Sequence, residues 1–347
     1  MASPSSAITR LDLSLTFQEL NLMANQKKFI GLSVLPVLAV AEEAATFPKI
    51  NIESLMGKVE DTRRNADGTY ARGDYEWGSD SYALTEHGVE EPVDDAKVER
   101  YGDIVRVEAI SEARAIYRVL QRLEYDIAAA VFDTTVWTGA ALTTAATAAW
   151  TTHASGVPHA DVMAAHQKVE DGCGETANTL VMSSKAYRNL LQCDEITGLL
   201  KYDATDVLLN AYQTLDQKAV REAAAGLRTL FQVDQILVGR ALQNSSDQGQ
   251  DASFASFWNT TLAMLCVVNN DGPGGDLESI QPQIGRTLFS SKNNEPIPGD
   301  DSDGLGSLIV EEYREEQRRG SVIRPRNKRQ IKILHAAAGH LINTVTA

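Results

Sequence analysis

Cysteine is scarce in this sequence. The 347 residues include three cysteines, Cys173, Cys193 and Cys266, and no two of them have the Cys-x-x-Cys spacing of a zinc site or a redox motif. A disulfide-stabilised scaffold needs more cysteines in closer groups. We expect the three side chains to be small apolar packing groups in a reducing compartment, with neither a disulfide nor a zinc ion.

Long apolar runs are also missing. The best candidate, Phe29 to Ala45, is broken by Pro36 and ends in Glu42 and Glu43, and it falls short of the roughly 18 to 20 residues that span a bilayer. No basic stretch precedes an apolar segment at the N-terminus, so we expect no secretory signal. The sequence predicts a protein that neither enters a membrane nor is exported.

Positive charge is the third deficit. Against 32 Lys and Arg residues stand 47 Asp and Glu residues, which gives a net charge of −15. Sequence-specific DNA binding depends on clustered Lys and Arg, so this balance argues against it, although it is compatible with enclosing nucleic acid without gripping it. Hydrophobic residues at 43% and charged residues at 23% are ordinary values for a folded protein. The length corresponds to about two domains, or to one domain with large insertions.

Recognisable catalytic and cofactor motifs are absent as well. The Gly172-Cys-Gly174 turn lacks the third glycine of a nucleotide-binding loop, and Asp300–Gly304 lacks the distal Glu of a calcium loop. His335 and His340 are five residues apart, which is not the spacing of a zinc-protease helix, and no Gly-x-Ser-x-Gly elbow occurs. We therefore predict no enzyme activity, no cofactor and no metal site.

One long helix is the strongest secondary-structure signal. Apolar residues from Ile116 to Val131 fall in a stripe about 80° wide when the chain is plotted at about 100° per residue. This pattern predicts a helix over 111–132, capped by Ser111 and followed by Gly139.

The opposite face of this helix carries a row of arginines. Arg114, Arg118 and Arg122 are each one turn apart. This arginine row is either a solvated face with Glu112 and Glu124 as local partners, or a surface that meets a neighbouring acidic surface or enclosed phosphates.

Charge is distributed unevenly along the chain. Residues 42–103 include 16 acidic and 7 basic residues, a net of −9, and residues 314–332 include 8 basic and 2 acidic residues, a net of +6. Such segments are either solvated faces or surfaces that pair, within one chain or between neighbouring copies.

The composition of two N-terminal segments predicts that they are not part of the core of their own chain. The stretch from Phe29 to Val40 is apolar but interrupted by proline, and we expect an arm lying along another surface. The polar stretch 51–98 contains Tyr75, Trp77 and Tyr82 and a turn signal at 66–69, which predicts a long hairpin. Because a hairpin with so few aliphatic residues is not stable alone in water, we expect a partner subunit to cover it.

Shorter elements alternate beyond the long helix. We expect an exposed loop or a short hairpin in the Ala/Thr-rich stretch 138–155, helices at 159–171 and 184–192, and strands at 179–182, 231–238, 263–268, 308–313, 320–324 and 330–335. This alternation, with long intervening loops, predicts the α+β fold class.

The order of these features resembles the major capsid protein of tailed bacteriophages, which has the HK97-like fold. The resemblance rests on order and spacing along nearly the whole chain, at 29–40, Tyr75–Asp95, Leu180–Leu191, Val233–Ala241 and Ile333–Ile342. It implies an N-terminal arm over 1–50, an extended E-loop hairpin within 51–103, a P-domain over 104–177 with the spine helix 111–132, an A-domain over 178–286, and a return to the P-domain over 287–347.

The resemblance also implies a function. The chain would be a structural protein that self-assembles as hexamers and pentamers into an icosahedral shell around phage double-stranded DNA, located in the virion and assembled in the bacterial host cytoplasm. We expect inter-subunit or lumen-facing contacts, with non-specific contact to packaged DNA, from Arg114, Arg118, Arg122, Tyr75, Trp77 and Tyr82. Because the arm begins near Met1, we expect a separate scaffolding protein, together with a portal protein; a decoration protein is left open.

Two alternatives stay open at this point. An encapsulin-type nanocompartment shell would share the fold but hold cargo enzymes in place of DNA. A soluble enzyme with an unrecognised site belongs to a different class, and it would be a monomer or small oligomer with a deep polar pocket.

Overall fold

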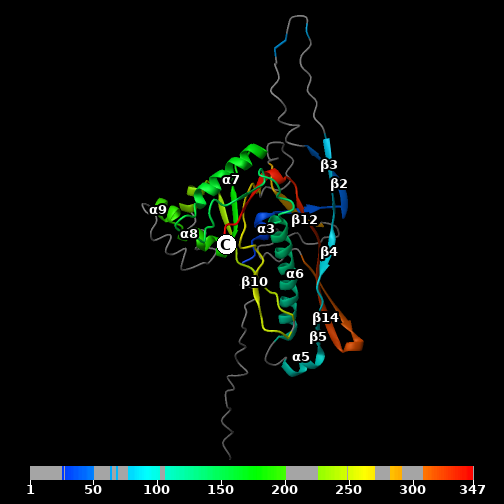
Figure 1. Ribbon diagram of the computed structural model, residues 1–347. Helices are drawn as coiled ribbons and strands as arrows, with labels where there is room; N and C mark the ends of the chain where they lie inside the picture. The colour runs from blue at the N-terminus through cyan, green and yellow to red at the C-terminus, as the bar shows by residue number, and fades with distance from the viewer. Residues whose placement is uncertain are drawn as a thin grey trace, which may run out of the picture.

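Two larger β-sheets and one long helix organise the described part of the molecule (Figure 1). The computed structural model describes residues 26, 28–50, 63–64, 68, 77–101, 106–200, 226–247, 249–269, 282–290 and 308–346. The mixture of helices and strands confirms the predicted α+β fold class. Within these ranges, no helix has both the length and the apolar character that crossing a bilayer requires.

The long helix, α6, runs from Val107 to Val131. It begins four residues before Ser111, so the predicted cap at Ser111 is wrong. Glu108 in the first turn is favourable near the positive end of the helix dipole, which helps the helix to start earlier. The predicted apolar stripe is buried, and it includes Leu120, Leu123, Ile127 and Val131.

A six-stranded sheet lies against α6. Its main path is β1-β12-β14-β13, and β4 and β5 also pair with β14. The strands are β1 Val37–Val40, β4 Thr85–Gly88, β5 Glu91–Asp94, β12 Gly285–Ser290, β13 Ile309–Glu315 and β14 Gly320–Ile333. β1 is parallel to β12, and the other pairs are antiparallel. The short helix α5, Asp95–Tyr101, follows β5.

β14 is one strand where the sequence predicted two. Pro325 lies near its middle, although a proline lacks the N–H that a central strand needs. β5 pairs with Gly320–Ile323 and β4 with Arg326–Arg329, so the proline falls between the two partner strands. Its carbonyl accepts a hydrogen bond from Val89 N in the β4–β5 connection. The break between β4 and β5 therefore removes the conflict that the proline would otherwise cause.

The segment from Phe29 to Val40 belongs to the core of its own chain. It forms the helix α3, Gly31–Val34, and then β1, with Pro36 between them. The predicted arm along another surface is therefore wrong for these residues, whereas residues 1–25 of the predicted arm lie outside the described ranges. The side chains of this segment that are buried with the α6 stripe are Ile30, Val34 and Leu35.

A five-stranded sheet with the order β6-β15-β11-β7-β8 forms the second layer. Its strands are β6 Thr143–Ala145, β7 Thr179–Ser183, β8 Gln235–Gly239, β11 Ala263–Cys266 and β15 Gly339–Asn343. The helices beside it are α7 Pro158–Cys173, α8 Ser184–Gln192 and α9 Asp194–Leu200. The helices predicted at 159–171 and 184–192 are confirmed, as is the strand predicted at 179–182.

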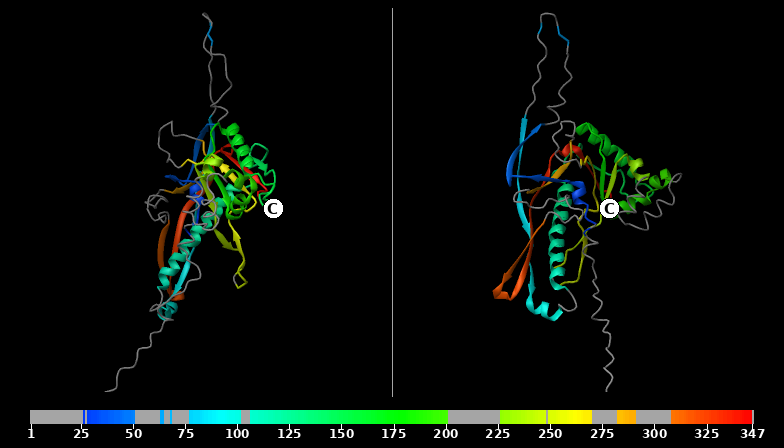
Figure 2. Two further views of the ribbon diagram at one scale, coloured as in Figure 1. Left: turned by 90° about the vertical axis from the view of Figure 1, so that its left-hand side faces the viewer. Right: turned by 180° about the vertical axis from the view of Figure 1, so that it is seen from behind.

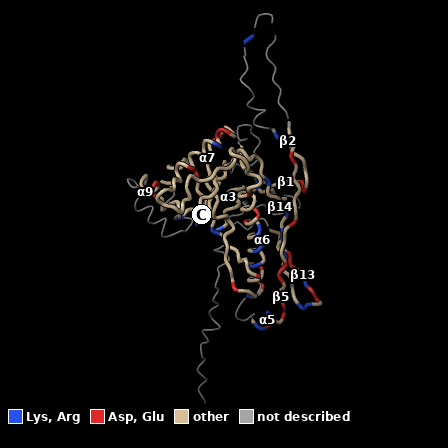
Figure 3. The backbone as a smooth tube through the Cα atoms, viewed as in Figure 1, with Lys and Arg blue, Asp and Glu red and all other residues tan. Residues whose placement is uncertain are grey.

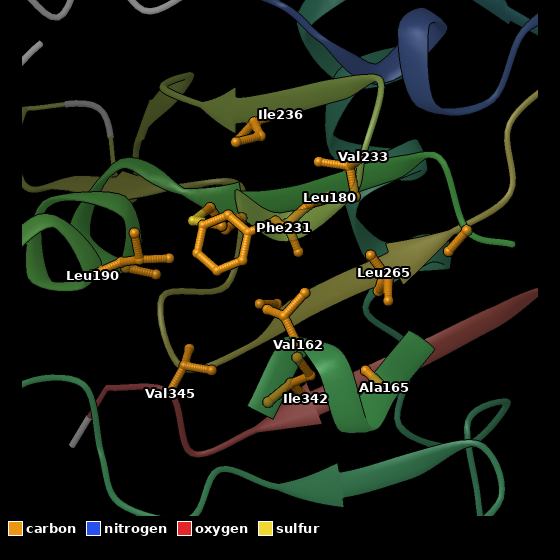
Figure 4. Close-up of a cluster of buried hydrophobic side chains, with 14 of the residues drawn as sticks. Val162, Ala165, Leu180, Leu190, Phe231, Val233, Ile236, Leu265, Ile342 and Val345 are labelled. Carbon is orange, nitrogen blue, oxygen red and sulfur yellow. The ribbon is translucent and has the colours of Figure 1, made fainter. Parts of the chain in front are cut away.

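Both faces of the five-stranded sheet are buried. Val162 and Ala165 of α7 belong to one cluster with side chains of the facing strands, among them Leu180 (Figure 4). Val181 and Met264 point to the other face, where they join the cluster that contains the α6 stripe. The sheet therefore lies between α7 and α6, which explains why its central strands are almost wholly apolar.

The predicted exposed loop or short hairpin at 138–155 is wrong, because this Ala/Thr-rich stretch contributes a strand to the five-stranded sheet. Its strand β6 pairs in parallel with β15. Trp150 is fully buried, and its indole N–H donates to Asp161 Oδ2 at 3.0 Å. The five-stranded sheet thus combines strands from the range 178–286 with β6 and β15 from outside it.

Two separate hairpins project from this body (Figure 2). One pairs β2, Ala44–Ile50, with β3, Trp77–Ala83, in antiparallel register. The other pairs β9, Leu242–Asn244, with β10, Phe254–Ser256. The turn predicted at 66–69 lies outside the described residues except for Gly68.

Candidate subunit-contact and lumen-facing surfaces

The arginine row belongs to α6, along which Figure 3 marks basic positions in blue. Arg114 and Arg118 share the carboxylate of Glu91 on β5, at 2.9 and 3.6 Å, and Arg122 Nε lies 2.8 Å from Asp126 Oδ1. The three arginine side chains are 58%, 51% and 63% exposed. Ion pairs this exposed contribute little stability, so most of the guanidinium surface remains accessible to a partner.

Glu124 is not a partner of the arginine row, so the sequence expectation is wrong for this residue. Its side chain is buried, and its Oε1 accepts hydrogen bonds from Ile30 N at 3.0 Å and from Trp258 Nε1 at 2.8 Å. Its Oε2 accepts from Gly31 N at 2.7 Å. Burial raises the pKa of Glu124 above its ordinary value, because the three hydrogen bonds offset only part of the lost hydration.

The Glu124 contact joins three distant parts of the chain: α6, the start of α3 and the indole of Trp258. A Cβ atom at Gly31 would lie 2.6 Å from Glu124 Oε2, so only glycine fits there. A signal for this role was present in the sequence, since Glu124 lies about 20° from Val131 on a helical wheel, at the edge of the apolar stripe.

Basic side chains on one face of β14 contact the acidic segment 42–103. Alternation along the strand places Arg324, Arg326, Lys328 and Lys332 on this face. Five ion pairs join the two charged segments within one chain: Glu43–Lys328 at 2.6 Å, Asp80–Lys332 at 2.7 Å, Glu86–Arg326 at 3.6 Å, Glu90–Arg324 at 3.7 Å and Asp95–Arg314 at 2.6 Å. Pairing within the chain, one of the alternatives that the charge distribution left open, is therefore present.

The opposite face of β14 meets α6. Arg329 is buried on this face, and its Nη2 lies 3.3 Å from Asp126 Oδ2 while its Nη1 donates to Asn327 Oδ1 at 3.2 Å. Burial lowers the pKa of Arg329, and the Asp126 carboxylate acts in the opposite direction. Asp126 therefore links the exposed Arg122 to the buried Arg329 and ties the helix to the sheet.

Of the predicted aromatic residues, Trp77 and Tyr82 belong to the β2–β3 hairpin, which lies on the other face of β14 from α6. Trp77 is the first residue of β3, and Tyr75 lies outside the described residues. The half-buried ring of Tyr82 lies 6.4 Å from the ring of Phe47 on β2. The structure does not bring Tyr82 together with the arginine row, so these two sets of candidate contact residues lie on separate surfaces.

The cysteines and a core histidine are engaged in packing. Cys173, Cys193 and Cys266 are free thiols and buried, and burial raises the pKa of Cys193 to about 11 and that of Cys266 to about 12. His166 Nε2 donates to the carbonyl of Phe231 at 2.8 Å. In the part of the chain that the structure describes, no group of three or more His, Cys, Asp and Glu side chains is placed to hold a metal ion.

Comparison with known sequences finds one informative relative. The chain is 24% identical over 319 residues to the "Major capsid protein" of Burkholderia phage BcepMu. The alignment covers 92% of each of the two chains. No family model matches the sequence.

Comparison with solved structures gives the fold. A phage-related protein from Bordetella bronchiseptica RB50 matches with a TM-score of 0.61 at 19% identity, over 93% of this chain and 96% of that one. The capsid of cyanophage P-SCSP1u matches with a TM-score of 0.52 at 10% identity, over 90% of this chain and 87% of that one. The chain therefore has the HK97-like fold of phage capsid structures, as its sequence pattern predicted.

Proposed function

We propose that this chain is the repeating subunit of an icosahedral phage head, arranged as hexamers and pentamers around double-stranded DNA. The observation that carries this proposal is the likeness to a phage major capsid protein over 92% of both chains, together with the HK97-like fold. The same relative favours a phage head over an encapsulin-type compartment, because that relative is a phage protein.

The domain assignment follows the two sheets. The P-domain would comprise the spine helix α6 with the six-stranded sheet, and the A-domain the five-stranded sheet with α7, α8 and α9. The β2–β3 hairpin would be the base of the E-loop, which reaches a neighbouring subunit. Three lysines hold this base to the body: Lys49 Nζ donates to the Leu334 carbonyl at 2.6 Å, and Lys328 and Lys332 pair with Glu43 and Asp80.

The arginine row would face the lumen or an adjacent subunit. Three largely exposed guanidinium groups on a chain of net charge −15 suit weak, non-specific contact with packaged DNA. A scaffolding protein and a portal protein are the further partners we propose, with assembly in the bacterial host cytoplasm.

The contents of purified particles test this function. We expect shells built from this chain to protect double-stranded DNA from nuclease when they come from infected cells. Shells that hold protein cargo without DNA would support the encapsulin-type alternative, and a monomer or small oligomer at every protein concentration would contradict both shell proposals.

A further inference from the structure

The β9–β10 hairpin turns its apolar side chains outward. Asn244 pairs with Phe254 across the hairpin, and alternate residues of a strand share a face, so Leu242, Asn244 and Phe254 lie on the same side. Phe254 is 71% exposed and Leu242 is 54% exposed. The apolar face of this hairpin is therefore its solvent-facing side, which is the reverse of the usual pattern.

The outward orientation is held by specific contacts. Asn244 Oδ1 accepts hydrogen bonds from Ser246 N at 3.1 Å and from Ser253 N at 3.0 Å, which closes the loop between the strands. Gln121 Nε2 of α6 donates to the Leu242 carbonyl at 3.4 Å. Because these contacts fix the register, the hairpin cannot turn its apolar face inward by a one-residue slip without losing them.

The residues around this face carry negative charge. From Ala241 to Phe257 the charged residues are Asp247 and Asp251, and both are exposed. Two hairpins that met face to face would bring four carboxylates together, so a two-fold contact between identical hairpins is disfavoured.

The exposed face of α6 offers the complementary chemistry. The arginine row supplies three largely exposed positive charges. Ile110 and Tyr125 lie on the same face of the helix, and each is 37% exposed, so apolar surface flanks the arginines. An acidic hairpin with an apolar face and a basic helix with apolar flanks match in both charge and hydrophobicity.

We propose that the outward face of the β9–β10 hairpin docks head-to-tail on the α6 face of a second copy of this chain, with Asp247 and Asp251 meeting the arginine row. Contacts between unlike surfaces of this kind close into a ring where the rotation between neighbouring copies allows it, and a ring is what a capsomer requires. This inference rests on the proposed function and names one of the surfaces through which the copies would meet.

The first test removes the apolar side chains. Leu242→Ser with Phe254→Ser is compared with Leu199→Ser, a control on α9 that is 50% exposed. Since all three side chains are largely exposed, each variant subunit should keep the wild-type melting temperature. Loss of the two hairpin side chains should weaken the affinity of the contact about tenfold or more. Sedimentation should then show that the double variant no longer forms shells, whereas the control should assemble as the wild type does.

The second test reverses the charges. Asp247→Arg with Asp251→Arg should impair shell formation, and so should Arg114→Asp with Arg118→Asp. A chain with all four changes should recover assembly relative to the Arg114→Asp with Arg118→Asp variant, because the contact between copies then again joins opposite charges. The Glu91 carboxylate beside positions 114 and 118 repels the new aspartates equally in both of these variants, so it cancels from the comparison.

The outcomes separate this inference from the proposed function. If the wild-type chain forms no shells, the proposed function fails. If the wild type forms shells and the serine double variant does so equally well, or if the four charge changes show no recovery, the docking proposal is overturned while the proposed function stands. The docking proposal is also overturned if the serine double variant still forms shells but no longer binds a different protein. In that case the different protein, and not a second copy of this chain, would cover the hairpin.

Discussion

Replacement of Glu124 by alanine is the most informative single perturbation of the fold. The Glu124 carboxylate is the acceptor for Ile30 N, Gly31 N and Trp258 Nε1, and all of these groups lie in the buried cluster beside α6. Each donor left without a partner costs about 1 to 3 kcal/mol. The loss of a buried carboxylate that is costly to ionise offsets part of this penalty, so we expect Glu124→Ala to lower the free energy of unfolding by about 3 kcal/mol or more.

Glu124→Gln separates the hydrogen bonds from the charge. Its single amide oxygen can still accept from Ile30 N and Trp258 Nε1, but its NH2 group would face the N–H of Gly31. One unsatisfied pair predicts a smaller loss, about 1 to 3 kcal/mol. Glu112→Ala is the matched control, because Glu112 is exposed on the same helix and its loss should change stability by less than about 0.5 kcal/mol.

Denaturant unfolding of the unassembled subunit, followed by tryptophan fluorescence, measures these differences. Burial raises the pKa of Glu124 above its ordinary value, so the folded chain holds this proton more tightly than the unfolded chain. The stabilising contribution of this group is therefore complete below that value and is lost as the pH rises through the folded-state pKa. The stability advantage of the wild type over Glu124→Gln should shrink as the pH rises through this window. A Glu124→Ala variant as stable as the Glu112→Ala control would refute the reasoning.

Three further predictions follow from buried contacts. Gly239→Ala places a Cβ atom against the buried indole of Trp258 and should cost about 1 to 3 kcal/mol, whereas Gly198→Ala, which meets no atom within 4 Å, should not destabilise; thermal melts compare the two. Asp126→Ala leaves the buried guanidinium of Arg329 with the Asn327 amide oxygen but without the Asp126 carboxylate, and it should cost about 3 to 5 kcal/mol in denaturant unfolding. The native subunit at pH 8 should resist maleimide labelling, because Cys193 and Cys266 are buried and their pKa values are raised to about 11 and about 12; rapid modification without denaturant would contradict this packing.

The sequence correctly predicted the helices that are determined by residues close together in the chain. The apolar stripe from Ile116 to Val131 identified the core of α6, and Ser184 to Gln192 form a helix over the predicted range. Ser183, just before that helix, accepts a hydrogen bond from Ala186 N, a cap that depends only on neighbouring residues.

The errors arose where distant parts of the chain decide the outcome. The stretch 29–40 is buried because β1 pairs with β12, so that Val37 lies opposite Thr287, and periodicity within twelve residues carries no information about that partner. Pro325 remains within a strand because β4 and β5 divide opposite it. The sequence predicted which types of residue would make the candidate contacts. It could not predict that these residues lie on two different faces of β14, because that depends on the register of the sheet.

Cryo-electron microscopy of particles formed by this chain tests the central claim most directly. The account predicts closed icosahedral shells in which α6 and the two sheets repeat in six-fold and five-fold groups, with the β9–β10 hairpin seated on α6 of the adjacent copy. Images that show only separate subunits or small open oligomers, under conditions in which the subunit is folded, would contradict it.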